Sequence, residues 1–356
     1  MKIPVLKESE MEQNEKIIDE AIKNSLNIIE QDREREIISR RFGLTGYKET
    51  LEQIGDMLSI TRERVRQLEK AILIRLRVSS EDGGIPALPA AEKLLVRNLT
   101  ETGRVAKVSD LADKIYGRET TPAERAGLSF IASISGSLTV VDENDRYFQS
   151  IGIAEYGDDR EIRKRVDEIV NIIKQNKSPM TLDELDSQLN YEHPSHIAAI
   201  ASVSKLLATL NGLWGLAKWP TVNPKNIRDK IYVVLDNNKQ PMHFSEIAKT
   251  ISESNFKRKN VTTQAIHNEL IKDSRFVLIG RGIYALDTWG YKKGTVSEII
   301  TSILKEADRP LSREEIVREV LHSRKVKETT ILLNLQNKKL FKKVDRNAYT
   351  LAKTTA

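Results

Sequence analysis

Six polar side chains between residues 62 and 70 are the part of the chain best suited to a defined chemistry. They place guanidinium, ammonium, amide and carboxylate groups at helical spacing: Arg62, Glu63, Arg64, Arg66, Gln67 and Lys70. Guanidinium and amide groups form paired hydrogen bonds with base edges, and Lys and Arg neutralise phosphates. Residues 61–77 hold six Lys or Arg and two Glu, a local charge of +4. The pattern predicts contact with duplex DNA; the alternative is a helical hairpin whose charges only face solvent.

The surrounding residues predict how these side chains are held. Apolar residues at helical spacing predict one helix from Thr50 to about Leu58 and a longer helix that begins after Thr61. Gln53 stands three positions after Thr50, as a capping box requires, and Thr61 can cap the second helix. The buried seam of the second helix is expected to be Val65, Leu68 and Ile72. This arrangement is a helix-turn-helix with a recognition helix long enough for the major groove.

Residues 26–77 resemble region 4 of the sigma-70 family of bacterial RNA polymerase sigma factors. The resemblance rests on DREREIISRRFGL at 32–44 and on TLEQIGDMLSITRERVRQLEKAILIRLR at 50–77. It implies a helical domain that reads the −35 promoter element and docks on the flap of the polymerase β subunit. By position, it also implies which side chains face bases and nearby phosphates: Arg62, Glu63, Arg66 and Gln67.

Two small residues are expected to shape the turn of this motif. Gly55 leaves room for a close approach by another helix. Ser59 stands where the sigma family usually has Gly, so it is expected to adopt the left-handed conformation at modest cost.

The composition favours several small helical domains and a polyanionic partner. The chain has 356 residues, of which 5% are aromatic and 30% charged, and it is too long for one small domain. Residues 221–356 hold 26 Lys or Arg and 15 Asp or Glu, a charge of +11, whereas residues 1–220 carry −5. A basic C-terminal third predicts nucleic-acid phosphate as the partner, and the alternative is a solubilising surface.

Some function classes are excluded by what the sequence lacks. It has no cysteine, which excludes disulfides, thiolate zinc sites and cysteine catalysis and fits a reducing cytosol. No apolar run approaches the roughly 18 residues that a membrane span needs, and the acidic N-terminus does not resemble a signal peptide. We therefore expect a cytoplasmic, nucleoid-associated protein without a membrane partner.

Beyond residue 90 the chain repeats one unit four times with divergence. SPMTLDELDSQL (178–189), QPMHFSEIAKTI (240–251) and RPLSREEIVREV (309–320) align, and RVAKVSDLADKI (104–115) is a weaker copy. Each copy is predicted to contain three helices and then a hairpin, which is the order of a winged helix. The expected fold is therefore mainly α, with a helix-turn-helix domain followed by about four tandem winged-helix domains.

The expected domain boundaries follow from these repeats and from composition. They are a flexible lead at 1–16, a region-4-like domain at 17–78, a linker at 79–90, and winged helices at 91–155, 160–221, 225–291 and 294–353. The first helix is expected from about Lys16 to Ile29, and the first hairpin at 137–150.

The third unit, 226–291, resembles the HARE-type winged helix of the delta subunit of some bacterial RNA polymerases. The resemblance rests on PMHFSEIAKTI and DSRFVLIGRGIYALDTWGY, including the terminal Trp. It implies a role in transcription or DNA binding and brings no catalytic residues.

The third helices of the four units differ in character. Those predicted at 256–273 and 323–340 are basic at their start and polar beyond it, which suits DNA. The DNA-contacting residues expected there are Lys257, Arg258, Lys259, Thr262, Thr263, Gln264, Lys325, Lys327 and Thr329. The corresponding helices at 121–135 and 195–210 are nearly uncharged, so we expect them to pack inside the protein or to bind protein.

Catalysis is not expected. The sequence has no Gly-rich phosphate loop, and His193 and His196 in YEHPSH lack the further ligands of a metal site. No cofactor, metal or small-molecule substrate is predicted.

The sequence as a whole predicts a DNA-binding transcription regulator or polymerase-associated factor. Nothing resembles the aromatic and basic helix with which sigma factors melt the −10 element, so a complete sigma factor is not expected. Two alternatives remain open: a protein-interaction scaffold that docks on RNA polymerase, and the DNA-recognition component of a restriction or defence system.

Overall fold

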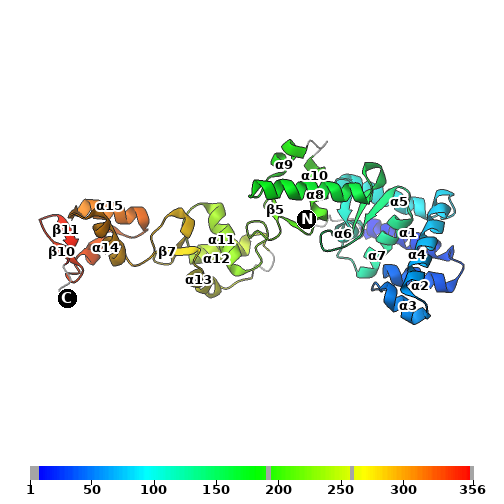
Figure 1. Cartoon of the computed structure of the whole chain (residues 1–356), viewed down its shortest axis with the longest axis horizontal. Coiled ribbons are helices and arrows are strands. Elements are labelled where there is room, and N and C mark those ends of the chain that lie inside the picture. Colours follow the sequence, from blue (N-terminus) through cyan, green and yellow to red (C-terminus); the bar gives the residue numbers. More distant parts are fainter. Residues whose placement is uncertain (1–7, 190–193, 257–259, 353–356) are drawn as a thin grey trace. The chain divides into compact units, whose positions relative to one another are not determined.

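A computed structural model describes residues 8–189, 194–256 and 260–352, and they are mainly helical, as the sequence predicts. This part of the chain contains sixteen α-helices and is 59% helical. Its strands form small antiparallel sheets. The chain divides into two compact units, residues 1–218 and residues 219–356 (Figure 1).

Unit 1 opens with four helices that include the helix-turn-helix. They are α1 (Glu8–Asn27), α2 (Asp32–Phe42), α3 (Leu51–Leu58) and α4 (Arg62–Glu81). Gly43 ends α2 in the left-handed region at φ 83°, where a residue without Cβ is least strained.

The predicted flexible lead at 1–16 is wrong from residue 8 onward, because α1 begins at Glu8 rather than near Lys16. The extra turns contact α6 of the following repeat: the Asn14 amide donates to the Ile115 carbonyl at 2.9 Å. Glu15 also pairs with Arg118 at 3.6 Å. These partners are about a hundred residues away in the sequence, so local periodicity did not reveal them.

The same element order then occurs in four successive segments, here called repeats 1 to 4. Repeat 1 contains α5 (Leu88–Thr102), β1 (Val105–Lys107), α6 (Val108–Tyr116), α7 (Pro122–Ile134), β2 (Leu138–Val141) and β3 (Ser150–Ile153). Repeat 2 contains α8 (Asp159–Asn176), α9 (Leu182–Leu189), α10 (Pro194–Val203), β4 (Leu207–Leu210) and β5 (Leu213–Leu216). Repeat 3 contains α11 (Ile227–Asn238), β6 (Met242–His243), α12 (Phe244–Glu253), α13 (Thr263–Lys272), β7 (Phe276–Gly280) and β8 (Ile283–Leu286). Repeat 4 contains α14 (Val296–Ala307), β9 (Leu311–Ser312), α15 (Arg313–Ser323), α16 (Glu328–Leu335), β10 (Phe341–Lys343) and β11 (Ala348–Leu351).

The sheets of the repeats share one topology. In repeats 1, 3 and 4 the short strand before the second helix pairs with the second strand of the hairpin, giving the orders β1-β3-β2, β6-β8-β7 and β9-β11-β10. In repeat 2 an isolated bridge between Met180 and Trp214 takes the place of the short strand. Each hairpin is thereby fixed to the helices of its own repeat.

One apolar core joins α1, α2 and α4 to repeat 1. It extends from Ile18 in α1 through Ile72 in α4 to Phe130 in α7 and Ile151 in β3, all fully or almost fully buried. The first domain therefore shares most of its interior with repeat 1, and only the helix-turn-helix keeps a small core of its own around Ile37, Ile54 and Val65.

The predicted linker at 79–90 is accordingly wrong in character. Helix α4 continues to Glu81, and α5 begins at Leu88. Ile85 and Leu88 are each 1% exposed within the shared core. Ser, Gly and Pro indicated a loose segment, but two apolar side chains in it anchor the connection.

Repeats 1 and 2 are joined by the hairpin loop of repeat 1. The Phe148 backbone N–H donates to the Val203 carbonyl at 2.8 Å, and Tyr147 forms a bridge with Ser204. Because this loop reaches repeat 2, the second strand of the hairpin starts only at Ser150, and the hairpin predicted at 137–150 is misplaced.

The helix predicted at 195–210 is also too long. Helix α10 ends at Val203, and Leu207–Leu210 is strand β4. Ser204 makes the break: its backbone N–H bonds to the Ala201 carbonyl and its hydroxyl accepts from the Leu206 N–H at 3.1 Å.

In unit 2, repeats 3 and 4 contact each other through an extended segment before α16. The Lys325 N–H donates to the Ile279 carbonyl of β7 at 2.9 Å. Gly280 permits this approach, since a Cβ there would lie 2.5 Å from the Lys325 oxygen. The segment from Arg324 therefore cannot be helical, and α16 starts at Glu328 rather than at 323.

Candidate nucleic-acid interface

Helix α4 presents the six polar residues predicted at 62–70 to solvent. Val65, Ile72 and Leu76 on its opposite face are almost fully buried and fix its rotation about its axis. The exposed residues of its first turns are Arg62, Glu63, Arg64, Arg66, Gln67 and Lys70. The Thr61 hydroxyl caps the helix by accepting from the Arg64 N–H at 3.2 Å, as predicted. The side chains that could reach bases therefore begin at the first helical residue.

The turn before α4 has the conformation that the sequence predicts. Thr50 and Gln53 form the capping box of α3, with hydrogen bonds of 2.9 and 3.2 Å. Ser59 adopts the left-handed conformation at φ 52° and ψ 45°. At Gly55 an added Cβ would lie 2.7 Å from the Ile60 carbonyl, so the close approach is to the turn itself. A larger residue at that position would push α3 and α4 apart.

Helix α2 braces the two helices of the motif from behind. Arg41 pairs with Glu69 of α4 at 3.1 Å, and Arg33 donates to the Leu58 carbonyl at the end of α3 at 2.8 Å. Arg75 of α4 also pairs with Glu34. These contacts lie away from the exposed face of α4 and leave that face unobstructed.

A side-chain network pre-arranges part of the exposed face. Glu63 and Arg66 pair at 2.6 Å, and the Gln67 amide donates to Glu63 at 3.4 Å. The hydrogen bonds from Arg66 lower the pKa of the Glu63 carboxyl. Within the described ranges Lys70 makes no ion pair. Arg66 is thus held by Glu63, while the exposed Lys70 ammonium is available to a phosphate.

The far end of α4 meets repeat 1 at a place that sequence reasoning missed. The Arg77 guanidinium donates to the Ser133 carbonyl near the end of α7 at 2.9 Å. Arg66, Lys70 and Arg77 line a hollow of about 280 Å³ there. These three residues are spaced by four and seven positions, which places them on one face of α4 and could have indicated the site. The residues after 78 were predicted to form a linker, so the packing of α7 against this end of α4 was not predicted.

Comparison with known proteins assigns this part of the chain. The family model described as sigma-70, region 4 matches residues 31–78. Residues 31–78 form a sigma-70 region 4 domain. In sigma factors, region 4 is a DNA-binding helix-turn-helix that contacts −35 promoter DNA.

Two curated relatives agree with this assignment over the same part of the chain. The chain is 40% identical over 67 residues to the chloroplastic RNA polymerase sigma factor sigF of Arabidopsis thaliana. It is 39% identical over 69 residues to the RNA polymerase sigma factor SigA of Microcystis aeruginosa. These matches cover 18% and 19% of this chain, and 12% and 16% of those proteins. The likeness to sigma factors therefore concerns the region 4 domain and little beyond it.

The third helices of repeats 1 and 2 do not offer a comparable face. Eight of the thirteen residues of α7 are buried, and Phe130 stacks edge-to-face on Phe42 of the region 4 domain at 5.2 Å between ring centroids. Helix α10 packs against β1 and α5 of repeat 1, as well as α8 and α9 of its own repeat. The expectation that these two helices pack or bind protein agrees with this burial.

In repeat 3 the polar residues predicted on the third helix lie at its start. Thr262 caps α13, and Thr263 and Gln264 are exposed in its first turn. The Gln264 amide donates to Asn268 at 3.0 Å, which adds a further exposed amide to this face. Asn268 was missed, although its spacing of four residues from Gln264 could have indicated it. Lys257, Arg258 and Lys259 lie outside the described residues.

In repeat 4 the three predicted residues are all exposed but do not all lie on α16. Lys327 is its N-cap, Thr329 is in its first turn, and Lys325 belongs to the segment that contacts repeat 3. The Lys325 backbone is fixed to β7 while its side chain remains exposed. The basic start of the helix is therefore held by repeat 3.

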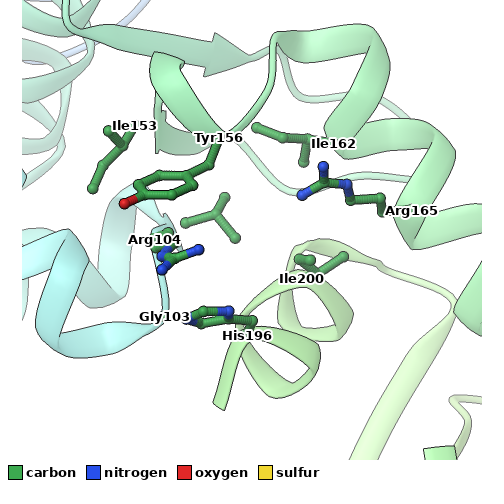
Figure 2. A pocket seen from close by; sticks show the side chains of 9 residues that line it. Gly103, Arg104, Ile153, Tyr156, Ile162, Arg165, His196 and Ile200 are labelled. Atoms are coloured by element: carbon green, nitrogen blue, oxygen red, sulfur yellow. The ribbon is translucent and has the colours of Figure 1, made fainter. Parts of the chain in front are cut away.

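A small cavity at the junction of repeats 1 and 2 is the other candidate site in unit 1. It measures about 40 Å³ and is bordered by Arg104, Tyr156, Arg165 and His196 (Figure 2). The Arg104 guanidinium lies 3.7 Å from the centroid of the Tyr156 ring, a cation–π contact. The lining residues come from both repeats, so the cavity marks their junction.

The described part of the chain offers neither a metal site nor a membrane-spanning helix. No group of three or more His, Asp or Glu side chains in it is arranged to hold a metal ion. His193 lies outside the described residues, and His196 borders the small cavity. Among the helices described, each is too short or too polar to cross a bilayer.

Proposed function

We propose that this chain is a duplex DNA-binding protein of transcription in which α4 reads a −35-like promoter sequence. The observation that carries the proposal is the exposed row of guanidinium, amide and ammonium groups at the start of α4, on a region 4 domain. Arg66 and Gln67 have the geometry for base edges, and Lys70 has the geometry for a phosphate. The capped, braced helix supports them in a fixed orientation.

We further propose that the four repeats are winged helices with two different tasks. Repeat 1 holds the region 4 domain through α7, and repeat 2 packs on repeat 1 through α10. Repeats 3 and 4 add DNA contacts through the starts of α13 and α16, where Thr263, Gln264, Lys327 and Thr329 are exposed. The resemblance of repeat 3 to HARE-type winged helices and the charge of +11 on residues 221–356 support this division.

The protein is proposed to act as a regulator or polymerase-associated factor in the cytoplasm, on the nucleoid, and not as a complete sigma factor. The matches to sigma factors cover at most 19% of this chain, and the repeats account for most of the remainder. Core RNA polymerase is a proposed partner through the flap of its β subunit, as region 4 implies.

Selection of bound sequences from a random DNA pool, with and without core RNA polymerase, tests the proposal. The expected outcome is enrichment of one sequence motif by the chain alone. Replacing Arg62, Arg66 and Gln67 together with Ala should remove the preference, because each bidentate base contact contributes about 1–3 kcal/mol of discrimination.

Lys93→Ala with Arg97→Ala provides a control on an exposed face of α5. This variant removes cations from unit 1 without touching α4, so its sequence preference should be unchanged. Unchanged discrimination in the triple α4 variant would refute base reading by α4. Enrichment seen only with polymerase present would favour a docking role instead.

A further inference from the structure

Repeat 4 has a groove along its hairpin whose lining combines apolar and basic side chains. The groove measures about 1160 Å³ and lies between the end of α16 and strands β10 and β11. Its larger apolar lining residues are Leu335, Phe341, Val344, Tyr349 and Leu351. Its charged lining residues are Lys338, Lys342 and Lys343, and no Asp or Glu of the described chain lines it.

Strand β10 forms one wall of this groove and is an edge strand. The sheet order is β10-β11-β9, so within the described residues β10 pairs with β11 alone. The Val344 N–H donates to Ala348 and the Ala352 N–H donates to Leu340, both at 2.9 Å. Since bonding direction alternates along an antiparallel pair, the backbone N–H and C=O of Lys343 face away from β11. They are available to an added strand.

An exposed apolar residue precedes strand β10 and another follows it. Leu340 is 40% exposed and Val344 54% exposed, whereas Phe341 between them is 3% exposed and anchors the strand in the core. A DNA backbone would use the lysines but would leave Leu340 and Val344 in water. A peptide strand with apolar side chains would cover them and gain free energy from their burial.

The lysines determine which kind of peptide fits. Within the part of the chain that the structure describes, Lys338, Lys342 and Lys343 make no ion pair. Lysines on an edge strand prevent identical strands from pairing, because two copies would bring like charges together. The same charges attract a strand that carries carboxylates.

We propose that the groove beside β10 binds an extended, acidic segment of another protein, which adds to the sheet as a strand. Its apolar side chains would cover Leu340 and Val344 on one face of the sheet. Its carboxylates, on the other face, would pair with Lys343, and Lys342 would add a longer-range attraction. This interaction is separate from DNA reading by α4 and does not rest on it.

The test uses the full chain and a fluorescein-labelled short peptide that alternates Glu with Val or Leu, followed by fluorescence anisotropy. The expected result is saturable binding in the micromolar range. Two control peptides separate the contributions: one has Lys in place of every Glu, and the other is oligoglutamate. Both should bind much more weakly, since the first reverses the charge and the second lacks apolar side chains.

Variants of the groove test the two proposed contacts separately. Lys342→Glu with Lys343→Glu should weaken the peptide by about tenfold or more through like-charge repulsion. The matched control, Lys305→Glu with Arg318→Glu on exposed positions of α14 and α15, should change affinity by less than about twofold. Lys343→Pro should bind more weakly than Lys343→Ala, because both remove the charge but only proline removes the outward N–H.

Three outcomes would overturn the proposal: no saturation up to about 1 mM peptide, equal affinity for the lysine peptide, or displacement of the peptide by a short DNA duplex whose binding also requires Lys342 and Lys343. The last result would make the groove a DNA site and would leave the function of α4 untouched. Circular dichroism shows whether the double charge reversal unfolds repeat 4. If it does, the difference in peptide affinity between Lys343→Pro and Lys343→Ala decides whether the peptide binds along β10.

Discussion

The third helices of unit 1 and unit 2 occupy the same place in the same element order but face different surroundings. Helix α7 buries eight residues, from Ala126 to Ile134, against the region 4 domain and its own repeat. Helix α13 buries only Ile266 and Leu270, and α16 only Ile331 and Leu335. One topology therefore serves as an internal support in unit 1 and as an exposed helix in unit 2. What packs against each helix decides between the two, because α7 contacts α1, α2 and α4 as well as α6 and β2 of its own repeat.

The hairpins show the same contrast. In repeat 1 the hairpin loop is used to hold repeat 2: the Tyr147 hydroxyl donates to Asp167 at 2.8 Å, and Lys205 pairs with Glu143 at 2.7 Å. In repeat 4 the hairpin remains exposed and its lysines are unpaired among the described residues. A hairpin loop that is bonded to a neighbouring repeat is not available to bind an outside partner.

The largest effect is expected from Phe130→Ala in α7. Removing a fully buried ring that packs on Phe42 should lower the free energy of unfolding of unit 1 by about 3–5 kcal/mol. Leu333→Ala in α16 is the matched control, because that side chain is 67% exposed and should cost less than about 0.5 kcal/mol. Urea denaturation followed by circular dichroism measures both. Similar losses in the two variants would show that α7 and α16 do not differ as described.

An intermediate effect is expected on the salt dependence of DNA binding. Lys325→Ala with Lys327→Ala should reduce the slope of log K against log salt by about 0.9 for each phosphate that these lysines no longer neutralise. Arg125→Ala in α7 is the comparison, since this arginine bonds to Thr120 within repeat 1. Its slope should equal that of the unmodified chain in a fluorescence titration. An unchanged slope in the lysine variant would remove repeat 4 from the DNA interface.

The smallest effect is expected from pH through Glu124 at the start of α7. Hydrogen bonds from Arg118, together with those from Thr121, lower the pKa of Glu124 to about 2 from its usual 4.5. Because the folded pKa is depressed, this stabilisation is present above pH 4.5 and is lost as pH falls toward 2. Glu124→Gln should therefore flatten the pH dependence of the melting temperature of unit 1 in that window.

Glu298→Gln, at the equivalent capping-box position of α14, offers the comparison for unit 2. Bonds from Thr295 lower the pKa of Glu298 as well, but its carboxyl is exposed to solvent. Its replacement should change the acid profile less than Glu124→Gln does. A larger change at Glu298 would contradict the greater dependence of unit 1 on its third helix.

Local signals predicted the helix-turn-helix correctly. Thr50, Gln53, Ser59 and Thr61 have the predicted capping and turn conformations, and the six polar residues of α4 are exposed as expected. These features depend on residues within one or two helical turns, and such short-range preferences can be recognised from spacing alone.

The sequence predictions that the structure contradicts share a different cause. Helix α1 starts earlier because Asn14 bonds to Ile115, and α16 starts later because Lys325 bonds to Ile279. The segment at 79–90 is anchored because Ile85 and Leu88 enter a core shared with distant helices. In each place a contact with a remote part of the chain overrides the local preference.

The sequence by itself determined that one helix carries an exposed row of polar and basic side chains, that a unit is repeated four times and that the last third is basic. Residue type and spacing are sufficient for those conclusions, since they concern local conformation and total charge. Only the tertiary structure decided which of the four third helices remain available to a partner and which hairpin keeps an open edge. Availability depends on what packs against a surface, and packing is a property of residues that the sequence separates.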